Sequence, residues 1–354
     1  MKMRSLSGVE FRGISVALVF FGLFATGSAL RAQSISMSYV TVANPNNGTD
    51  PATGNLYGSV SYTYNIGEYD VTDSQYCTFL NDVDPTGANA LALYSPQGDA
   101  EYGISLNSGA ASGSKYSVIN GYASMPVVDV DYWNTLRFVN WMNNGEGNAG
   151  TETGAYTLLG GTPTPANASS LLANPQHNAG ATVWLPSENE WYKAAYYDPA
   201  NGTYSTYATQ SNTAPGNLIG NGGNEVNYIT GNGYCVTQTG TSTFTASQNY
   251  LTAIGTFSNS PSYYGTYDQS GDVYNWIDTT LYSDYPVLRG GSWDNYFPDP
   301  SYVSSSNRDY YFPTVENAEY GFRVANVPEP TSLTLMLAGA FGLAVIRGKP
   351  FKRL

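Results

Sequence analysis

The first clear helical pattern begins at Thr72, where Gln75 follows three residues later. This spacing lets the hydroxyl and the amide each cap a backbone N–H group of the first turn. Apolar residues then recur at i, i+3, i+4 and i+7, which places them on one face of a helix. This face consists of Tyr76, Phe79, Leu80 and Val83. We therefore predict a helix that starts at Thr72 and packs one side against a core.

Two further helices are predicted by the same reasoning. One begins near Asp131 and ends in Asn143-Asn144-Gly145, a sequence typical of a helix C-terminus. The other begins at Ser187, has Glu190 three residues later as a second reciprocal cap, and ends at Asp198-Pro199. The expected buried positions are Thr135, Phe138, Val139 and Met142, flanked by Trp133 and Trp141, in the former, and Trp191, Ala194 and Ala195 in the latter.

The rest of the sequence shows little helical periodicity. Residues 33–62 combine polar residues with sparse apolar alternation, which indicates short strands and loops. Residues 84–125 and 145–181 are long and irregular, and 200–325 alternates short aromatic or β-branched runs with Gly, Asn, Ser and Pro. Long loops are unusual in compact domains. Here they favour an α+β fold in which a small twisted sheet and two or three helices support much ordered loop.

The N-terminus has the pattern of a secretory signal peptide. Lys2, Arg4 and Arg12 precede an apolar stretch at residues 14–25, and small residues follow near Ala29 and Ala32. A basic head, an apolar centre and a small-residue exit are typical of such signals. The alternative is an uncleaved membrane anchor, which the short apolar stretch disfavours because a spanning helix needs ~20 residues. We assign residues 1–32 to a signal peptide.

The C-terminus has a second apolar segment in a different setting. Val327-Pro328-Glu329-Pro330 precedes an apolar segment at 333–346 and a basic tail that contains Arg347, Lys349, Lys352 and Arg353. This order resembles the PEP-CTERM sorting signal of Gram-negative bacteria, in which a motif, a transmembrane hydrophobic segment and a basic tail lead to processing by an exosortase. The resemblance implies that 327–354 is a sorting segment. Positive residues stay cytoplasmic, so the body would reach the cell envelope or the extracellular matrix. A plain C-terminal anchor is the alternative.

Between these ends the chain is strongly acidic. The ends hold eight of the fourteen Lys and Arg residues and two of the 27 Asp and Glu residues, which leaves six basic and 25 acidic residues and a net charge of about −19. Such a surface repels nucleic acid and anionic lipid, so we expect no nucleic-acid partner. Abundant tyrosine among uncharged polar residues is common in extracellular binding proteins. Cys77 and Cys235 could form a disulfide in an oxidising compartment, or could be two buried small hydrophobes.

Five blocks of sequence, spread over roughly residues 60–325, share the order of a known family's motifs. The blocks are Ile66-Gly67-Glu68-Tyr69-Asp70-Val71-Thr72, Pro126-Val127-Val128-Asp129-Val130, Trp184-Leu185-Pro186-Ser187-Glu188-Asn189-Glu190-Trp191, Tyr267-Asp268-Gln269-Ser270-Gly271-Asp272-Val273-Tyr274-Asn275-Trp276, and Arg289-Gly290-Gly291-Ser292-Trp293 with Gly321-Phe322-Arg323-Val324-Ala325. Together they resemble the formylglycine-generating enzyme, or sulfatase-modifying factor, family. The resemblance implies an elaborated C-type-lectin-like α+β fold, with residues 63–326 as the domain and 33–62 as a strand and loop segment before it.

The resemblance also implies calcium sites. The family's ligands match Asp268, Gly271, Val273 and Asn275, and carboxylate plus carbonyl oxygens suit a hard cation. Asn275 stands where the family has Glu, so a lower affinity is expected. A turn held by Asp268 hydrogen bonds alone is the alternative. A second site would use Asn217 and the carbonyl of Leu218.

The family's two reactive cysteines correspond to positions 295 and 300 of this chain. Here they are Asn295 and Pro300. Neither can bind copper(I), which needs soft thiolate, or form a disulfide with a substrate, so no copper is expected. Cys77 and Cys235 lie far from these positions in sequence and replace neither. This loss removes the family's oxidase mechanism.

Most other motif residues have a structural interpretation. We expect Trp276 and Trp293 in the core and a backbone at Gly290 and Gly291 that tolerates no side chain. We expect the buried arginines Arg289 and Arg323 to meet carboxylates such as Glu188 or Glu190. His177, the one histidine of the chain, is expected to be a solvated loop residue. The acids Asp129 and Asp131 could support glycosidic chemistry, but Asp131 is better explained as a helix cap.

The sequence therefore favours an exported, non-catalytic surface protein that binds glycan or peptide in the extracellular matrix. Its partners would be the exosortase machinery and, before processing, the membrane through the C-terminal segment. The ligand would lie against the loops that flank the substrate groove in the family's enzymes. The candidate ligand-binding residues are Asn295, Tyr296, Phe297, Tyr302, Arg308, Tyr310 and Tyr311. The alternative is a formylglycine-generating oxidase acting on a sulfatase cysteine, which the missing cysteine pair disfavours.

Overall fold

The computed structural model describes residues 34–96, 103–173, 176–220, 222–238, 240, 242–295 and 297–328. The predicted signal peptide, the apolar segment at 333–346, the basic tail and Tyr296 lie outside these residues. Within them, no helix is both long enough and apolar enough to span a membrane.

The three predicted helices are present, and each begins at its predicted cap. They are α1 (Asp73–Val83), α3 (Tyr132–Asn143) and α5 (Glu188–Tyr196). Reciprocal caps join Thr72 to Gln75 at α1 and Ser187 to Glu190 at α5. The Asp131 side chain accepts a hydrogen bond from the Asn134 backbone at α3. The capping signals in the sequence were therefore sufficient to find these helices.

Three local expectations differ from the structure. Helix α5 ends at Tyr196, since Tyr197–Asp198 forms strand β6. Helix α3 has no solvated side until its last turn, because every residue from Tyr132 to Trp141 is buried. The stretch expected to be loop at 145–181 contains the short helix α4 (Ala168–Ala173). Short 3₁₀ helices at Pro51–Thr53 (η1) and Pro300–Val303 (η2) were also missed.

One four-stranded sheet joins segments from both ends of the domain. Its order is β1 (Tyr39–Val42), β2 (Tyr64–Gly67), β12 (Ala325–Asn326) and β5 (Val183–Trp184). All its pairs are antiparallel. Because β1 pairs with β2 along four residues, the segment at 33–62 contributes a strand to the same sheet as the domain that follows it.

The second four-stranded sheet carries the C-terminal motifs. Its order is β10 (Asp309–Tyr310), β9 (Tyr285–Arg289), β8 (Tyr274–Leu281) and β11 (Tyr320–Phe322). The β8–β11 pair is parallel and the other two pairs are antiparallel. Two small hairpins, β3 (Ile104–Leu106) with β4 (Tyr116–Val118) and β6 with β7 (Thr203–Tyr204), complete the strands of the described residues.

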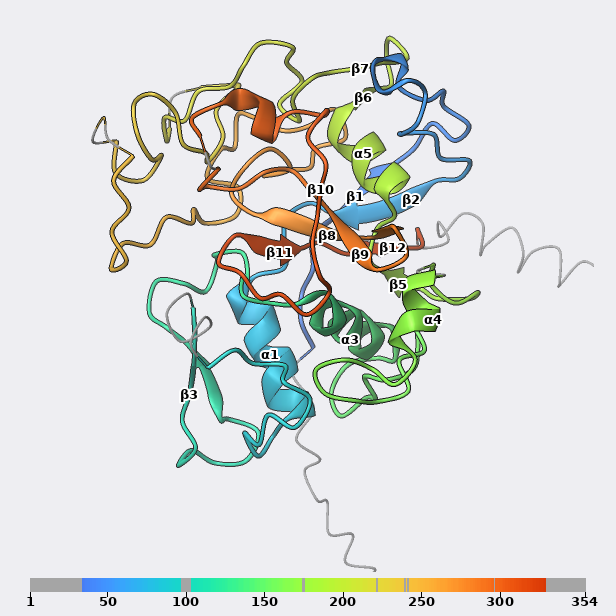
Figure 1. Ribbon diagram of the computed structural model, residues 1–354, viewed down its shortest axis with the longest axis vertical. Helices are drawn as coiled ribbons and strands as arrows, with labels where there is room; N and C mark the ends of the chain where they lie inside the picture. Colours follow the sequence, from blue (N-terminus) through green and yellow to red (C-terminus); the bar gives the residue numbers. More distant parts are fainter. Residues whose placement is uncertain are drawn as a thin grey trace, which may run out of the picture. The chain divides into compact units, whose positions relative to one another are not determined.

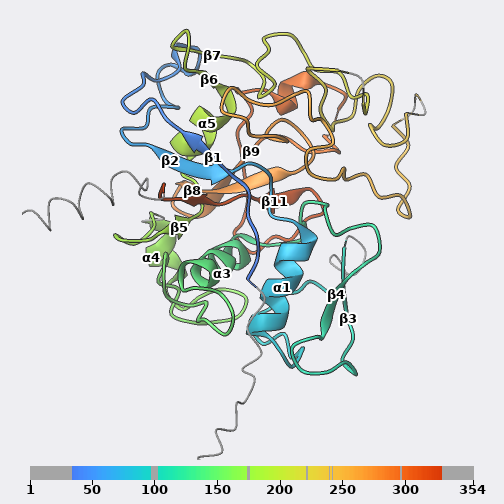
Figure 2. The ribbon, with the colours of Figure 1, turned by 180° about the vertical axis from the view of Figure 1, so that it is seen from behind.

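Helices cover both faces of the second sheet (Figures 1 and 2). Successive side chains of a strand point to opposite faces. Along β8, Trp276 packs in the large core formed with α1 and α3, whereas Ile277 packs with Trp191 of α5. Along β9, Leu288 packs in the core formed with α1 and α3, and Val287 packs with Trp191 of α5. The mixed helix and strand architecture confirms the predicted α+β class, while its C-type-lectin-like character stays a prediction.

Aromatic rings dominate the core between α1, α3 and the sheet. The Phe138 ring lies 5.2 Å from Phe322 and 5.9 Å from Tyr76, and Phe79 lies 5.4 Å from Trp141. Such pairs contribute about 0.5–1.5 kcal/mol each beyond the burial of their area. This core holds the C-terminal motif block against the first helices.

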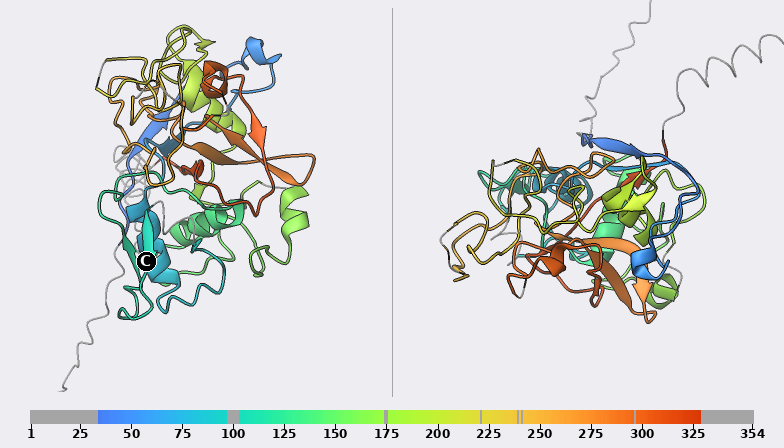
Figure 3. Two further views of the ribbon diagram at one scale, coloured as in Figure 1. Left: turned by 60° about the vertical axis from the view of Figure 1, so that its left-hand side comes forward. Right: turned by 90° about the horizontal axis from the view of Figure 1, so that it is seen from above.

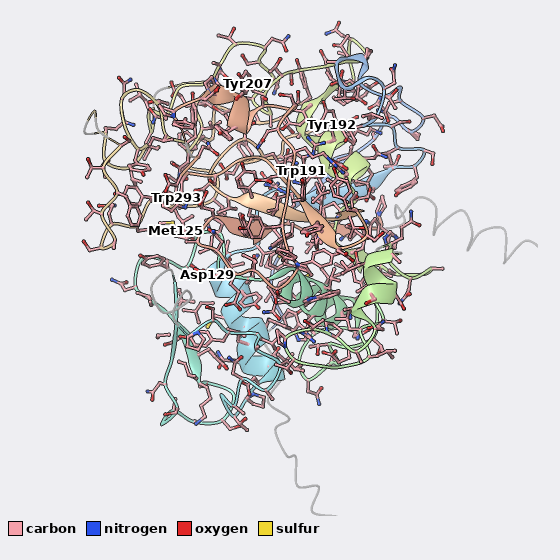
Figure 4. All side chains as sticks on the ribbon, viewed as in Figure 1. Met125, Asp129, Trp191, Tyr192, Tyr207 and Trp293 are labelled. Atoms are coloured by element: carbon pink, nitrogen blue, oxygen red, sulfur yellow. The ribbon has the colours of Figure 1, made fainter. Side chains whose placement is uncertain are left out.

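The segment between β7 and β8, at 205–273, is built of loops, as the sequence predicts, and is coloured yellow to orange in Figure 3. A small apolar cluster fixes part of this segment against the motif block that contains Trp293. Tyr234 and Tyr250 pack on Trp293 with ring centres 5.9 and 4.9 Å away. Met125 lies against the same cluster, near Trp293, whereas Trp191 and Tyr192 lie at α5 (Figure 4). The predicted burial of Trp276 and Trp293 is confirmed.

Candidate functional site

A cavity of about 380 Å³ lies beside Asn295, the position that corresponds to the family's first cysteine. Its lining residues are Tyr274, Asp294, Asn295, Tyr302, Asp309, Glu319 and Tyr320. A second cavity, of about 410 Å³, lies near the start of α1, but no charged side chain lines it. The chemistry available for recognition is therefore concentrated at Asn295.

The parallel pairing of β8 with β11 builds the floor of this cavity. It sets Tyr320 opposite Tyr274, with ring centres 6.1 Å apart and edge to face. The backbone N–H of Tyr274 donates to the Glu319 carbonyl at 2.8 Å, which places Glu319 at the entry to β11. Strand β10 contributes Asp309, and η2 contributes Tyr302. Four segments between residues 274 and 320 thus meet at one end of the sheet.

The Gly290-Gly291 pair lets η2 approach this end of the sheet closely. Gly290 and Gly291 have φ values of +106° and +79°, where residues with a Cβ are strained. A Cβ on Gly291 would lie 2.5 Å from the Tyr302 carbonyl oxygen. The expectation that neither position tolerates a side chain is confirmed. The turn therefore fixes where Tyr302 meets the cavity.

Three carboxylates give the cavity its electrostatic character. The Ser292 hydroxyl donates to Glu319 Oε2, and the Tyr234 hydroxyl donates to Asp294 Oδ1 at 2.9 Å. Burial, with a smaller contribution from the charges of Asp294 and Asp309, raises the pKa of Glu319 to about 7. Burial also raises the pKa of Asp294. No Lys, Arg or His is among the described residues that line the cavity.

Asn295 adds a hydrogen-bond donor to the acidic lining. Its side chain is 4% exposed, and its Oδ1 accepts from the Ser292 backbone N–H at 3.2 Å. Its Nδ2 is buried without a hydrogen-bond partner among the residues that the structure describes. A buried donor left without an acceptor costs about 1–3 kcal/mol. An amide here, in place of a cysteine, suits the recognition of a ligand oxygen.

The predicted ligand-binding residues divide into two groups. Asn295 and Tyr302 line the cavity, and Tyr311 lies beside it, since its ring centre is 6.2 Å from that of Tyr320. Phe297, Arg308 and Tyr310 do not line it, and Tyr296 lies outside the described residues. Arg308 binds Glu188 through two hydrogen bonds of 2.6 and 2.7 Å, whereas Phe297 and Tyr310 are exposed.

The lining residues that the sequence did not reveal are Tyr274, Asp294, Asp309, Glu319 and Tyr320. Three of them were next to recognised motif residues: Asp294 follows Trp293, and Glu319-Tyr320 directly precedes Gly321. Adjacency to a motif is the signal that could have found them. Asp309 lies between the candidate residues Arg308 and Tyr310, and Tyr274 belongs to the fourth motif block itself.

The buried arginines meet carboxylates, and one of the two predicted partners is correct. Arg289 Nη2 lies 2.6 Å from Glu188 Oε1, as expected. Arg323 pairs instead with Asp70 at 2.9 Å. Glu190, the other expected partner, accepts from the Trp184 indole and from the cap residue Ser187. Glu190 sits at the third position of α5, and its role in the cap points it away from both arginines.

At the first predicted calcium site, the side-chain oxygens face N–H donors. Asn275 Oδ1 accepts from Trp191 Nε1 at 2.9 Å and from Arg323 Nε at 2.8 Å. Asp268 is half-buried, and its Oδ2 accepts from the Gly255 backbone at 2.8 Å. The Gly271 N–H donates to the Gly290 carbonyl, and Val273 is buried in the cluster around Trp293. As arranged, Asp268 Oδ2 and Asn275 Oδ1 both accept hydrogen bonds from N–H groups, as in the hydrogen-bonded turn that is the alternative to a cation site.

The second predicted site has the same character. The Gln238 side-chain amide donates to the backbone oxygen of Asn217 at 2.8 Å, to its Oδ1 at 3.3 Å and to the Cys235 carbonyl at 2.9 Å. The Leu218 N–H donates to Glu225 Oε2. An amide nitrogen thus lies where three oxygens converge. No group of three or more acidic, His or Cys side chains that could hold a metal occurs in the described part of the chain. Calcium binding stays a prediction.

The cysteines and the histidine lie outside the cavity lining. Both cysteines are buried thiols, which was the alternative to a disulfide. Burial, followed by the charges of Asp272 and Glu225, raises the pKa of Cys235 to about 12. Tyr234, the neighbour of Cys235, packs on Trp293. The loop that carries Cys235 therefore lies closer to this motif block than the sequence separation indicated. His177 stacks on Trp184 with ring centres 4.8 Å apart, with Nδ1 3.7 Å from Asp278 Oδ2, so it is not simply solvated.

Comparisons with known proteins agree with this arrangement at the level of the family. A model of the sulfatase-modifying factor enzyme 1-like domain matches residues 50–328. No curated protein matches the chain. Solved structures similar to it include Treponema denticola variable protein 1, at 17% identity and a TM-score of 0.46, covering 84% of this chain and 97% of that one.

Two further solved structures are similar to the same extent. CarF has 16% identity and a TM-score of 0.46, with 83% of this chain and 99% of that chain covered. PvdO from Pseudomonas aeruginosa has 17% identity and a TM-score of 0.42, with 82% and 92% covered. Similarity at this level carries no argument about function, so the function has to be inferred from the cavity itself.

Proposed function

Since this chain belongs to the sulfatase-modifying factor enzyme 1-like domain family, we propose that it is a non-catalytic, exported member that binds an extracellular ligand in the cavity beside Asn295. The ligand would be a glycan or peptide of the matrix outside the cell. The observation that carries the proposal is the cavity of about 380 Å³, with polar and aromatic side chains, at the place where the family's oxidases are expected to react.

The sulfur chemistry of the chain supports a non-catalytic role. Asn295 lines the cavity and Pro300 starts η2, so neither family cysteine position can supply a thiolate. The two thiols present are buried, Cys77 on α1 in the aromatic core and Cys235 in the loop region. A thiol whose pKa is raised by burial is a poor nucleophile and a poor copper ligand, because the thiolate is the reactive form.

The lining of the cavity supports a binding role. Its volume lies within the range of about 300–1,000 Å³ that is typical of small-molecule sites. Three tyrosines supply flat amphipathic surfaces, and the carboxylates and Asn295 supply acceptors and a donor that can fix a ligand's orientation. Tyr311 and Phe312, 44% and 54% exposed, extend the aromatic surface beyond the cavity.

Export and sorting complete the proposal. They rest on the signal-peptide pattern at 1–32 and on the PEP-CTERM-like segment at 327–354, with an exosortase as the processing partner. The cell envelope or the extracellular matrix would then be the place of action. Labelling of intact cells with an antibody to the domain would test this: surface labelling supports it, and a signal only after lysis contradicts it.

Binding can be tested with glycan and peptide arrays probed with the full-length chain. We expect discrete ligands for the wild type, loss of their signal in Tyr302→Ala, and retention in Tyr62→Ala, which removes a 47% exposed tyrosine that does not line the cavity. Silent arrays would leave only a structural role. Formation of formylglycine on a cysteine-containing peptide with copper present would overturn the non-catalytic proposal.

Calcium is the remaining expectation of the family resemblance. Binding would require donors such as Gln238 or Arg323 to move away from the oxygens they now contact. Thermal unfolding with calcium and with a chelator tests it. A higher Tm with calcium supports the site, and identical curves rule out a calcium ion that stabilises the fold.

A further inference from the structure

Building on the proposed binding function, we propose that the cavity beside Asn295 recognises a primary ammonium group carried by an amino sugar of a glycan. The ligand chemistry follows from three properties of the lining: its uncompensated negative charge, its aromatic rings and the buried donor of Asn295. Each property narrows the class of ligand.

The negative charge of the lining favours a cationic ligand. Asp294, Asp309 and Glu319 line one cavity, and no described lining residue is basic. One described donor meets each of them: the Tyr234 hydroxyl, the Tyr310 backbone N–H and the Ser292 hydroxyl. An ionised carboxylate can accept about four hydrogen bonds, so acceptor capacity remains on all three. An ammonium group brings one positive charge and three hydrogen-bond donors.

The tyrosines favour the same group. Tyr274, Tyr302 and Tyr320 line the cavity together with the carboxylates. A ring face attracts an ammonium through its quadrupole, by about 0.5–2 kcal/mol according to how far the cation is desolvated. Carboxylates mixed with tyrosine rings therefore distinguish an organic cation from an anion or from a purely apolar group.

Asn295 favours an amino sugar over a lysine side chain. Its Nδ2 is a buried donor with no acceptor among the described residues, and an oxygen on the ligand close to the ammonium would satisfy it. A 2-amino sugar has hydroxyl oxygens on the carbons next to its amine. A lysine ammonium ends a chain of four methylene groups that offers no acceptor nearby. The exposed rings of Tyr311 and Phe312 beyond the cavity give neighbouring sugar units a surface for stacking.

The test compares two glycans that differ only at the amine. Isothermal titration of the full-length chain with a glucosamine oligosaccharide and with its N-acetylated form, at about pH 6.5 where a sugar amine still carries a proton, measures the contribution of the charge. We expect the free amine to bind at least about tenfold more tightly, because charge-assisted hydrogen bonds would be lost on acetylation. Because this comparison uses the wild-type protein, it stays decisive even if a variant fails to fold.

Variants then place the interaction in the cavity. Glu319→Gln and Asp309→Asn should each weaken binding of the amine about tenfold. Asp284→Asn removes one charge from the exposed turn between β8 and β9 and should leave the affinity unchanged.

Each other outcome has a defined meaning. Equal affinity for the two glycans, lost in Tyr302→Ala, would overturn the ammonium assignment and leave the binding function standing. Binding of a lysine peptide but of neither glycan would overturn the amino-sugar assignment. Absence of binding to glucosamine oligosaccharide, together with silent arrays, would remove both the inference and the proposed function.

Discussion

Two charged clusters lie on opposite sides of the Gly290-Gly291 turn, and they differ in how their charge is balanced. On one side, Glu188 meets two arginines, Arg289 and Arg308. On the other side, three carboxylates line the cavity beside Asn295 with no basic residue among its described lining. Charge that only supports a fold is normally paired when it is buried. The three carboxylates of the cavity are only half-buried, so they can stay ionised without a basic partner and remain available to a ligand.

The Glu188 cluster has the properties of a scaffold. Glu188 Oε1 accepts from Arg289 Nε, Arg289 Nη2 and Arg308 Nε at 2.9, 2.6 and 2.6 Å, and Oε2 accepts from Arg308 Nη2 at 2.7 Å. The Arg289 guanidinium also lies 4.7 Å from the centre of the Tyr57 ring. These contacts tie α5, β9 and the loop before β10 together.

Removal of Glu188 should have the largest effect on stability. In Glu188→Ala, Arg289 stays buried without its carboxylate, which is expected to cost about 3–5 kcal/mol of unfolding free energy. Urea denaturation measures this loss. The exposed control Asp284→Ala should change the unfolding free energy by less than about 0.5 kcal/mol. Equal behaviour of the two variants would show that the cluster does not support the fold.

Substitution of Gly291, in the turn between the clusters, should have the second-largest effect on stability. In Gly291→Ala, the positive φ costs about 1–2 kcal/mol, and displacement of the Tyr302 backbone should add about 1–3 kcal/mol. Gly113→Ala is a matched control, because its φ is +76° and no atom lies within 4 Å of the added Cβ. Equal losses of unfolding free energy in the two variants would mean that η2 moves aside at no measurable cost. The turn would then not fix the position of Tyr302.

The Glu319 carboxyl in the cavity should have a smaller effect on stability, which makes the unfolding free energy depend on pH. The pKa of Glu319 is about 7 in the folded chain against 4.5 as the ordinary value, so the folded state holds this proton more tightly. The unfolding free energy should therefore fall as the pH rises from about 4.5 to 7, because the unfolded state then binds fewer protons. For a partly exposed group we expect a fall of about 1 kcal/mol.

The variant Glu319→Gln isolates this contribution. Its amide does not titrate, so the difference in unfolding free energy from the wild type should grow in the variant's favour between about pH 4.5 and 7. Denaturation curves at pH 4.5, 6 and 8 measure the difference. Parallel pH profiles for the two proteins would show that the Glu319 carboxyl is not perturbed by burial.

Local chemistry in the sequence predicted the helices and part of the scaffold. Thr72, Asp131 and Ser187 mark helix starts because a cap needs only residues within one turn. The pairing of Arg289 with Glu188 followed from the cost of a buried charge and from a carboxylate in a neighbouring motif. For Arg323 the expected kind of partner, a carboxylate, was right but the residue was not, since Asp70 is 253 residues away and is brought close by the pairing of β2 with β12.

The cavity could be located from the sequence but its chemistry could not. Its position followed from the resemblance, through Asn295. Its charge depends on Asp309 and Glu319, which meet only because β10 and β11 belong to one sheet. Strand register of that kind is set by long-range packing and has no local signature in two- and three-residue strands. The aromatic lining likewise depends on Tyr274 facing Tyr320 across a parallel pair.

The unfolding free energy of the double variant Asp309→Asn/Glu319→Gln at pH 8, without ligand, tests most directly whether the cavity's acids serve binding or the fold. If they are kept for a ligand, removal of two like charges should leave the protein as stable as the wild type or stabilise it by about 1–2 kcal/mol. A loss of about 3 kcal/mol or more, comparable to that of Glu188→Ala, would contradict the account and assign these acids to the scaffold.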